Sequence, residues 1–231
     1  MKAIYILHIE TATPVCSVAL SLNGKTVASA EAEEGNLHAS HLTLFITAVL
    51  DEAGISVEEI QAVAVSKGPG SYTGLRIGVS TAKGLCYALD IPLISVDTLD
   101  GMVQGFLHVG GDGKYDVLFP MIDARRMEVY TAAYGPQGDK LHHTEAIIID
   151  ETSFDQCREK RIALFGSGAD KFAEMFKGSD KISVIPHFKN TAKHLCPLAF
   201  HKYINQEFED LVYFEPFYLK DFVPTTPKKR N

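Results

Sequence analysis

Residues 62–90 read AVAVSKGPGSYTGLRIGVSTAKGLCYALD, and this stretch decides the fold class. Its first residues are apolar and β-branched, which predicts a buried strand. The turn GPG (68–70) breaks that strand, and a long helix is then predicted because apolar residues recur at helical spacing, at Leu75, Val79, Ala82, Cys86 and Leu89. The apolar run PLISV (92–96) predicts the next strand, so the stretch indicates a parallel β-α-β crossover.

The rest of the chain extends this α/β pattern. Before the crossover, strands are predicted at 3–10, 15–22 and 25–34, with Asn23-Gly24 as a hairpin turn, and a helix at 39–53. After it, strands are predicted at 117–123, 128–135, 141–149 and 162–166, and helices at 98–109, 169–177 and 191–205. We therefore expect two lobes, residues 1–98 and 99–231, with the last segment a candidate to pack back onto the first lobe.

The composition is that of an ordinary globular chain. It has 231 residues, 46% of them hydrophobic, and a net charge of −7, which argues against a free-standing nucleic-acid binder. The basic run at 228–230 is predicted to be a solvated tail. None of the four cysteines forms a C-x-x-C pair. Because no apolar run approaches the length of a membrane span, we expect a cytoplasmic protein without membrane contacts.

The glycine turn at 68–74 resembles a phosphate loop but fits neither standard pattern. A Walker loop requires a lysine and a hydroxyl residue after its last glycine, and here Gly74 precedes Leu75 and Arg76. A dinucleotide fingerprint requires G-x-G-x-x-G, and this spacing is one residue longer. Pro69 also removes a backbone donor from the turn. We therefore do not expect a phosphate here.

The glycines continue along the predicted helix instead. Small residues recur on it at Gly74, Gly78, Thr81, Gly84 and Ala88. Because glycine inside a helix costs about 1 kcal/mol relative to alanine, such a row is usually retained where another backbone comes close. The helix at 39–53 is the predicted neighbour. Two readings stay open: both helices pack inside the lobe, or together they form a docking surface for a second protein.

Several motifs resemble one family. SKGPGSYTGLRIGVSTAKGLCYAL (66–89) resembles the signature of the TsaB family, also called YeaZ, and ILHIETATPVCSVAL (6–20) its opening strand pair. FPMIDARRMEVYTAAY (119–134), LFGSGADKF (164–172) and PFYLKDF (216–222) resemble later segments of the family. The resemblance implies an α/β, two-lobe fold like that of actin, Hsp70 and sugar kinases, with mixed sheets flanked by helices.

The resemblance also implies a function and partners. It implies a non-catalytic subunit for threonylcarbamoyladenosine formation next to the tRNA anticodon, working with a TsaD-like paralogue and a TsaE-like ATPase, and a homodimer when alone. tRNA would be contacted through the complex. No cofactor is expected on the isolated chain, although ATP, ADP or a metal ion could bind in the complex. The implied partner interface comprises His38, His41, Leu42, Phe45, Tyr72, Gly74, Ile77, Gly78, Thr81, Gly84 and Ala88.

A nucleotide site of the kinase type has weaker support. Kinases of this fold place an Asp-x-Gly turn after the first strand, so that backbone N–H groups reach the phosphates. Here the turn is Glu10-Thr11-Ala12-Thr13-Pro14, without glycine, and Glu10 is expected to accept an N–H bond in its own turn. The weak nucleotide candidates are Glu10, Thr11, Asp123, Arg125, Gly166 and Gly168.

An enzyme of the same fold, either ATP-dependent or like a metalloprotease, is the alternative. His38 and His41 match no metal motif, and no metal site is predicted. His142 and His143 are expected to point to opposite faces of a strand. Ser71 does not match a nucleophile elbow and is expected to cap the long helix.

Overall fold

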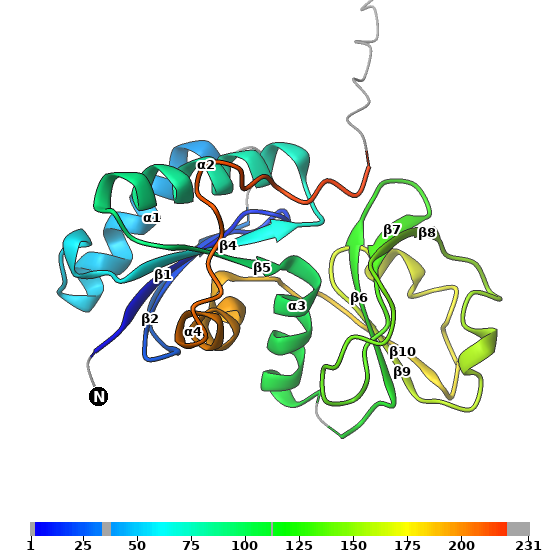
Figure 1. Ribbon diagram of the computed structural model, residues 1–231. Helices are drawn as coiled ribbons and strands as arrows, with labels where there is room; N and C mark the ends of the chain where they lie inside the picture. Colours follow the sequence, from blue (N-terminus) through cyan, green and yellow to red (C-terminus); the bar gives the residue numbers. More distant parts are fainter. Residues whose placement is uncertain (1–2, 34–37, 112, 221–231) are drawn as a thin grey trace, which may run out of the picture.

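A computed structural model describes residues 3–33, 38–111 and 113–220, without the side chains of residues 38–40. It contains two five-stranded sheets (Figure 1). The first has the order β3-β2-β1-β4-β5. Its strands are β1 (Tyr5–Glu10), β2 (Cys16–Leu22), β3 (Lys25–Ala32), β4 (Ala62–Gly68) and β5 (Leu93–Asp97). The first three strands are antiparallel and β4 and β5 run parallel to β1, as the predicted crossover requires.

Helices cover both faces of the first sheet (Figure 1). On one face lie α1 (His38–Ala53) and α2 (Tyr72–Leu89), whose buried residues, including Leu42, Val49 and Val79, share a core with Leu7 and Val63. On the other face lies α4 (Cys196–Ile204). Since both faces are covered, the central strands are buried along nearly their whole length rather than at alternate residues.

The second sheet has the order β10-β9-β6-β7-β8. Its strands are β6 (Val117–Asp123), β7 (Glu128–Thr131), β8 (Glu145–Ile148), β9 (Ile162–Phe165) and β10 (Ile182–Ile185). Helix α3 (Thr98–Phe106) leads directly from β5 and packs on this sheet through Leu99, Met102 and Phe106. The predicted α/β class and the two-lobe arrangement of mixed sheets flanked by helices are confirmed.

Two predicted elements differ clearly from the structure, and one strand is not predicted. The strand expected at 141–149 begins at Glu145, so His142 and His143 precede it, and His143 pairs with Glu145 at 2.7 Å. The helix expected at 169–177 is a 3₁₀ helix at Asp170–Phe172 followed by turns, because the chain packs Phe172 and Phe176 into the core while reversing direction. Strand β10 was missed. Its partly buried residues give it no sharp apolar signal.

The chain returns to the first lobe after β10. A 3₁₀ helix (Ala192–Leu195) and α4 bury Leu195 and Ala199 against Ile6 and Ile94 of the first sheet. Residues 205–220 then run past the edge of that sheet and along α2 towards the second lobe (Figure 1), and we call this segment the strap. The division of the chain at residue 98 stays a prediction. No helix of the described residues is long and apolar enough to cross a membrane.

The glycines of α2 have two different environments. A Cβ at Gly74 would collide with the backbone oxygen of Thr11, and one at Gly78 with the Thr11 hydroxyl. Gly84 is exposed, and a Cβ there would have no atom within 4 Å. The first two glycines therefore let α2 approach the loop after β1, while Gly84 leaves a shallow place on the surface.

Gly74→Ala and Gly84→Ala make a matched pair on this one helix. We expect Gly74→Ala to lower the free energy of unfolding by at least about 2 kcal/mol, because the loop backbone must move. Gly84→Ala should raise it by about 0.5–1 kcal/mol through helix propensity alone. Urea denaturation of both variants checks this. Equal effects at the two positions would show that α2 does not need the close approach.

Candidate functional site

The predicted interface residues separate into two groups. Leu42 is 1% exposed and belongs to the core, and Gly74 and Gly78 are buried against Thr11. These three therefore serve the packing of the lobe, which corrects their assignment to an exposed docking surface. The His38 side chain lies outside the described residues. The remaining candidates are partly or fully exposed on α1 and α2: His41, Phe45, Tyr72, Ile77, Thr81, Gly84 and Ala88.

The exposed side of α1 and α2 also carries large apolar side chains that the sequence did not single out. Leu44 of α1 is 63% exposed and Tyr87 of α2 is 83% exposed. Tyr87 flanks the shallow place at Gly84, three residues away on the same helix. Large exposed apolar groups beside a small-residue depression are typical of an interaction surface.

Glu10 ends β1 at the junction of the two lobes, where it is fully buried. One carboxylate oxygen accepts the Ala12 N–H at 2.6 Å, so Glu10 closes its own turn as expected. The other accepts from the side-chain amide of Asn190 at 2.7 Å. Burial raises the pKa of Glu10 to about 7, although these two hydrogen bonds oppose the rise. Glu10 thus ties the first strand to the segment that returns from the second lobe.

Thr11 is also engaged in a hydrogen bond within the protein. Its hydroxyl donates to the Gly74 carbonyl at 2.8 Å, and the next residue, Ala12, accepts from the Ser71 N–H at 2.7 Å. Ser71 also caps α2, since its hydroxyl accepts from the Gly74 N–H at 3.2 Å. The loop after β1 is therefore fastened to the start of α2.

The turn after β6 holds the second group of candidates. The carboxylate of Asp123 accepts from the Arg125 N–H at 2.9 Å and from Lys171 Nζ at 2.7 Å. Lys171 also donates to the backbone carbonyls of Arg126 and Glu128, at 2.8 and 2.7 Å. Arg125 and Arg126 both have positive φ, 74° and 53°, which non-glycine residues seldom adopt. Lys171 therefore stabilises a turn whose backbone conformation is unfavourable for the two arginines.

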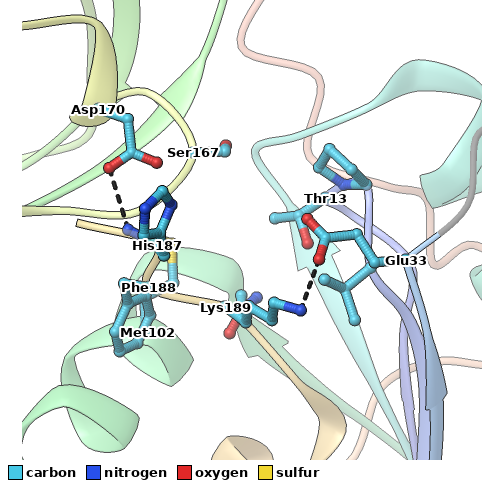
Figure 2. A pocket seen from close by; sticks show the side chains of 11 residues that line it. Thr13, Glu33, Met102, Ser167, Asp170, His187, Phe188 and Lys189 are labelled. Atoms are coloured by element: carbon cyan, nitrogen blue, oxygen red, sulfur yellow. Dashed lines mark hydrogen bonds and ion pairs between the residues drawn. The ribbon is translucent and has the colours of Figure 1, made fainter.

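Two cavities lie between the lobes. One, of about 440 Å³, is lined by residues that include Thr13, Asp170 and Asn190. Figure 2 shows Lys189 and Glu33 meeting at its side in an ion pair of 2.6 Å. The other cavity, of about 920 Å³, lies between the start of α2, the turn after β6 and the strap. Ser167, between Gly166 and Gly168, lines both.

These residues do not fit the phosphates of a kinase-type nucleotide. Both oxygens of Glu10 are already engaged, and the Ala12 N–H that could face a phosphate bonds to Glu10. A Cβ at Gly168 would crowd the backbone of Ile122, and the Gly168 N–H donates to the Met121 carbonyl at 2.9 Å. That second glycine turn thus supports the end of β6. Of the six nucleotide candidates, Asp123 and Arg125 line the larger cavity, and Glu10, Thr11, Asp123 and Gly168 form hydrogen bonds within the protein.

Metal-ligand geometry is likewise not found in the part of the chain that the structure describes. No group of three His, Cys, Asp or Glu side chains gathers there. His41 contacts the ring of Phe45, with centroids 5.7 Å apart. His8 is buried beside Ser21, and burial lowers its pKa to about 3.

Sequence reasoning missed Asn190, Lys171 and His194. Asn190 lies 180 residues from Glu10 in the sequence, and no local pattern links them. The ring of His194 lies 3.3 Å from the Asn190 side-chain oxygen, and burial lowers its pKa to about 4. Lys171 stands in the segment 169–177, for which the sequence predicts a helix. Its three bonds depend on a turn more than 40 residues earlier.

Glu10→Gln tests the buried carboxyl. The folded-state pKa of about 7 lies above the ordinary value of 4.5, so the folded chain keeps a proton that the unfolded chain releases as the pH rises. The stability of the wild type should therefore fall as the pH rises from about 4.5 to about 7. Relative to it, Glu10→Gln should gain about 3 kcal/mol over that range, because glutamine does not titrate. Urea unfolding across pH measures the difference. Glu58→Gln, at an exposed position, is the control, and parallel curves for Glu10→Gln and wild type would contradict the assignment.

Lys171→Met tests how the turn after β6 is held. We expect the backbone amides of residues 124–128 to exchange with deuterium about tenfold faster, because three hydrogen bonds to the turn are lost. Lys177→Met removes a lysine whose ion pair with Glu174 is exposed, and serves as the control. Unchanged exchange in the Lys171 variant would show that the turn is stable without it.

Comparisons with known proteins identify relatives of this chain. The TsaD family, described as tRNA N6-adenosine threonylcarbamoyltransferase, matches residues 32–221. The tRNA threonylcarbamoyladenosine biosynthesis protein TsaB of Escherichia coli K12 is 31% identical over 228 residues, which cover 94% of this chain and 95% of that protein. TsaB of Haemophilus influenzae is 25% identical over 96% of each chain.

Solved structures show the same fold. YeaZ from Pseudomonas aeruginosa matches with a TM-score of 0.76 and 27% identity, covering 95% of this chain and all of the other. Component A of the Acidaminococcus fermentans (R)-2-hydroxyglutaryl-CoA dehydratase matches in fold alone, with a TM-score of 0.53 and 12% identity. The chain belongs to the TsaB (YeaZ) family of tRNA threonylcarbamoyladenosine biosynthesis proteins.

Proposed function

We propose that this protein is a non-catalytic partner subunit that scaffolds and activates a TsaD-like transferase in threonylcarbamoyladenosine formation next to the tRNA anticodon. The names of its relatives support the pathway. The observation that carries the subunit role is the surface of α1 and α2, where Leu44 of α1 and Tyr87 of α2 are exposed and Gly84 has no side chain. Such a surface suits close packing with helices of another chain.

The same surface would serve a homodimer when the protein is alone. On α2 this surface carries the small exposed residues Gly84 and Ala88, together with the exposed side chain of Tyr87. Two such faces, or one such face and that of a TsaD-like paralogue, can bring helix backbones close together without losing apolar contact. The proposal includes a TsaE-like ATPase and tRNA as further members of the assembly, with tRNA contacted through the complex, in the cytoplasm.

The absence of catalysis by the isolated chain is part of the proposal. Support comes from the engaged carboxylate of Glu10 and from the turns after β1 and β6, which offer no cradle for phosphates. ATP, ADP or a metal ion would accordingly bind in the complex rather than to this chain alone. The alternative, an ATP-dependent or metalloprotease-like enzyme, is not favoured, since these same groups would have to provide its site.

Ala88→Leu and Gly84→Leu test the interface. Each adds a side chain to the exposed side of α2, so we expect co-purification with a TsaD homologue and tRNA modification in cells to fall together, by at least about tenfold. His201→Leu on α4 is the matched control, because it adds an exposed leucine on the opposite face of the sheet. Circular dichroism confirms folding. If both α2 variants still pair with the TsaD homologue, the partner does not bind this surface.

A further inference from the structure

The larger cavity between the lobes contains a charge arrangement that the proposed function does not use. Its lining includes the loop after β1 at 12–14, the start of α2 at 70–73, the turn after β6 at 122–126 and the strap at 217–220. We call it the diarginine groove, after Arg125 and Arg126, which both line it.

The two arginines are the unbalanced charges of this groove. Asp123 pairs with Lys171 at 2.7 Å, and Glu128 pairs with Lys220 of the strap. Both acidic side chains of the groove thus already have a cation. Among the described residues, neither Arg125 nor Arg126 has an ion pair or a side-chain hydrogen bond, and both are exposed. Two exposed arginines therefore line the groove without an ion-pair partner among the described residues.

Contacts from both sides keep the arginines in place. Lys171 fixes the backbone of their turn from within the second lobe, as described above. The strap fixes it from the other side through Lys220 and Glu128, and is itself anchored on the first lobe, where the Phe217 N–H donates to the Lys67 carbonyl at 2.7 Å. Because the turn is held at both ends, little ordering would be needed when an anion binds.

Three of the four aromatic side chains that line the groove contact other aromatic or apolar groups, and the fourth, Phe217, is 38% exposed. The ring of Tyr72 contacts that of Tyr218 in a tilted arrangement, with centroids 4.8 Å apart, and the Arg76 guanidinium lies 4.3 Å from the Tyr72 centroid. Tyr130 packs partly into the second core. Nucleobases are usually held by stacking on free aromatic faces, so a nucleotide or RNA strand finds little here.

We propose that the diarginine groove binds an extended acidic segment of a partner protein, with carboxylates paired to Arg125 and Arg126. The planar guanidinium group accepts a carboxylate through two parallel hydrogen bonds, which lysine cannot reproduce. A cavity of about 920 Å³, open between two lobes and a strap, holds several residues of an extended chain. This surface is separate from α1, and the proposal does not depend on the interface proposed above.

A dye-labelled hexaglutamate peptide is the probe, and fluorescence anisotropy at low ionic strength is the measurement. The full-length protein should bind it, and Arg125→Glu and Arg126→Glu should each weaken binding by at least about tenfold, the loss typical of a charge-assisted hydrogen-bond pair. Arg158→Glu is the matched control, because Arg158 is exposed in the second lobe outside the groove. It should change the affinity by less than about twofold.

Lys171→Met removes both the bonds that hold the turn and the cation paired with Asp123. It leaves both arginines in the chain but removes the bonds that hold their turn, so hexaglutamate binding should weaken while the melting temperature stays above the assay temperature. Arg126→Lys keeps the charge but loses the paired donors, and should weaken binding more than Arg158→Glu does.

Three results would overturn the proposal. The first is absence of hexaglutamate binding to the wild-type protein. The second is an equal loss in the Arg158→Glu control, which would indicate non-specific attraction. The third is tighter, Arg125-dependent binding of tripolyphosphate or an oligoadenylate, which would make the groove a phosphate site. None of these results bears on pairing through α1 and α2, so the two proposals fail separately.

Discussion

The close approach of α2 to the loop after β1 is the constraint on which the other features depend. Gly74 and Gly78 have no side chain, so the loop backbone at Thr11 can lie against the helix, where it is fixed by hydrogen bonds from Thr11 and Ser71. With the loop fixed, Glu10 is directed inward and meets Asn190. One packing detail in the first lobe thereby determines where the chain re-enters from the second lobe, and so how the cavities between them are shaped.

The sequence predicted the elements of the first lobe well because their signals are local. Alternation, the Asn23-Gly24 turn and the apolar seam of α2 each act within a few residues, and β1 to β5 appear in the expected order. The second lobe was predicted less well. Segment 170–177 has a helical apolar spacing, yet it folds as turns, since the packing of Phe172 and Phe176 overrides propensity there.

The residues of the candidate site show the same difference between local and long-range interactions. That Glu10 accepts an N–H bond within its own turn is a local matter, and its sequence context indicated it. Asn190 and Lys171 act across long separations and carry no local signal. The glycines of α2 are a third case. Their residue type indicated that another backbone segment lies close to the helix, but it did not indicate which segment. Gly74 and Gly78 meet the loop after β1, whereas a Cβ at Gly84 would contact no neighbouring atom of the described residues.

The return of α4 to the first sheet has a consequence for how the chain can be divided. The second sheet is built from residues 117–185, whereas the segments before and after it, up to β5 and from Ala192 to Ile204, share one core. In topological terms the second sheet is inserted between two segments that together form the first lobe. A fragment cut after β5 would leave the apolar face of Ile6, Ala64 and Ile94 without its covering helix, so the first lobe is complete only with both ends of the described chain present.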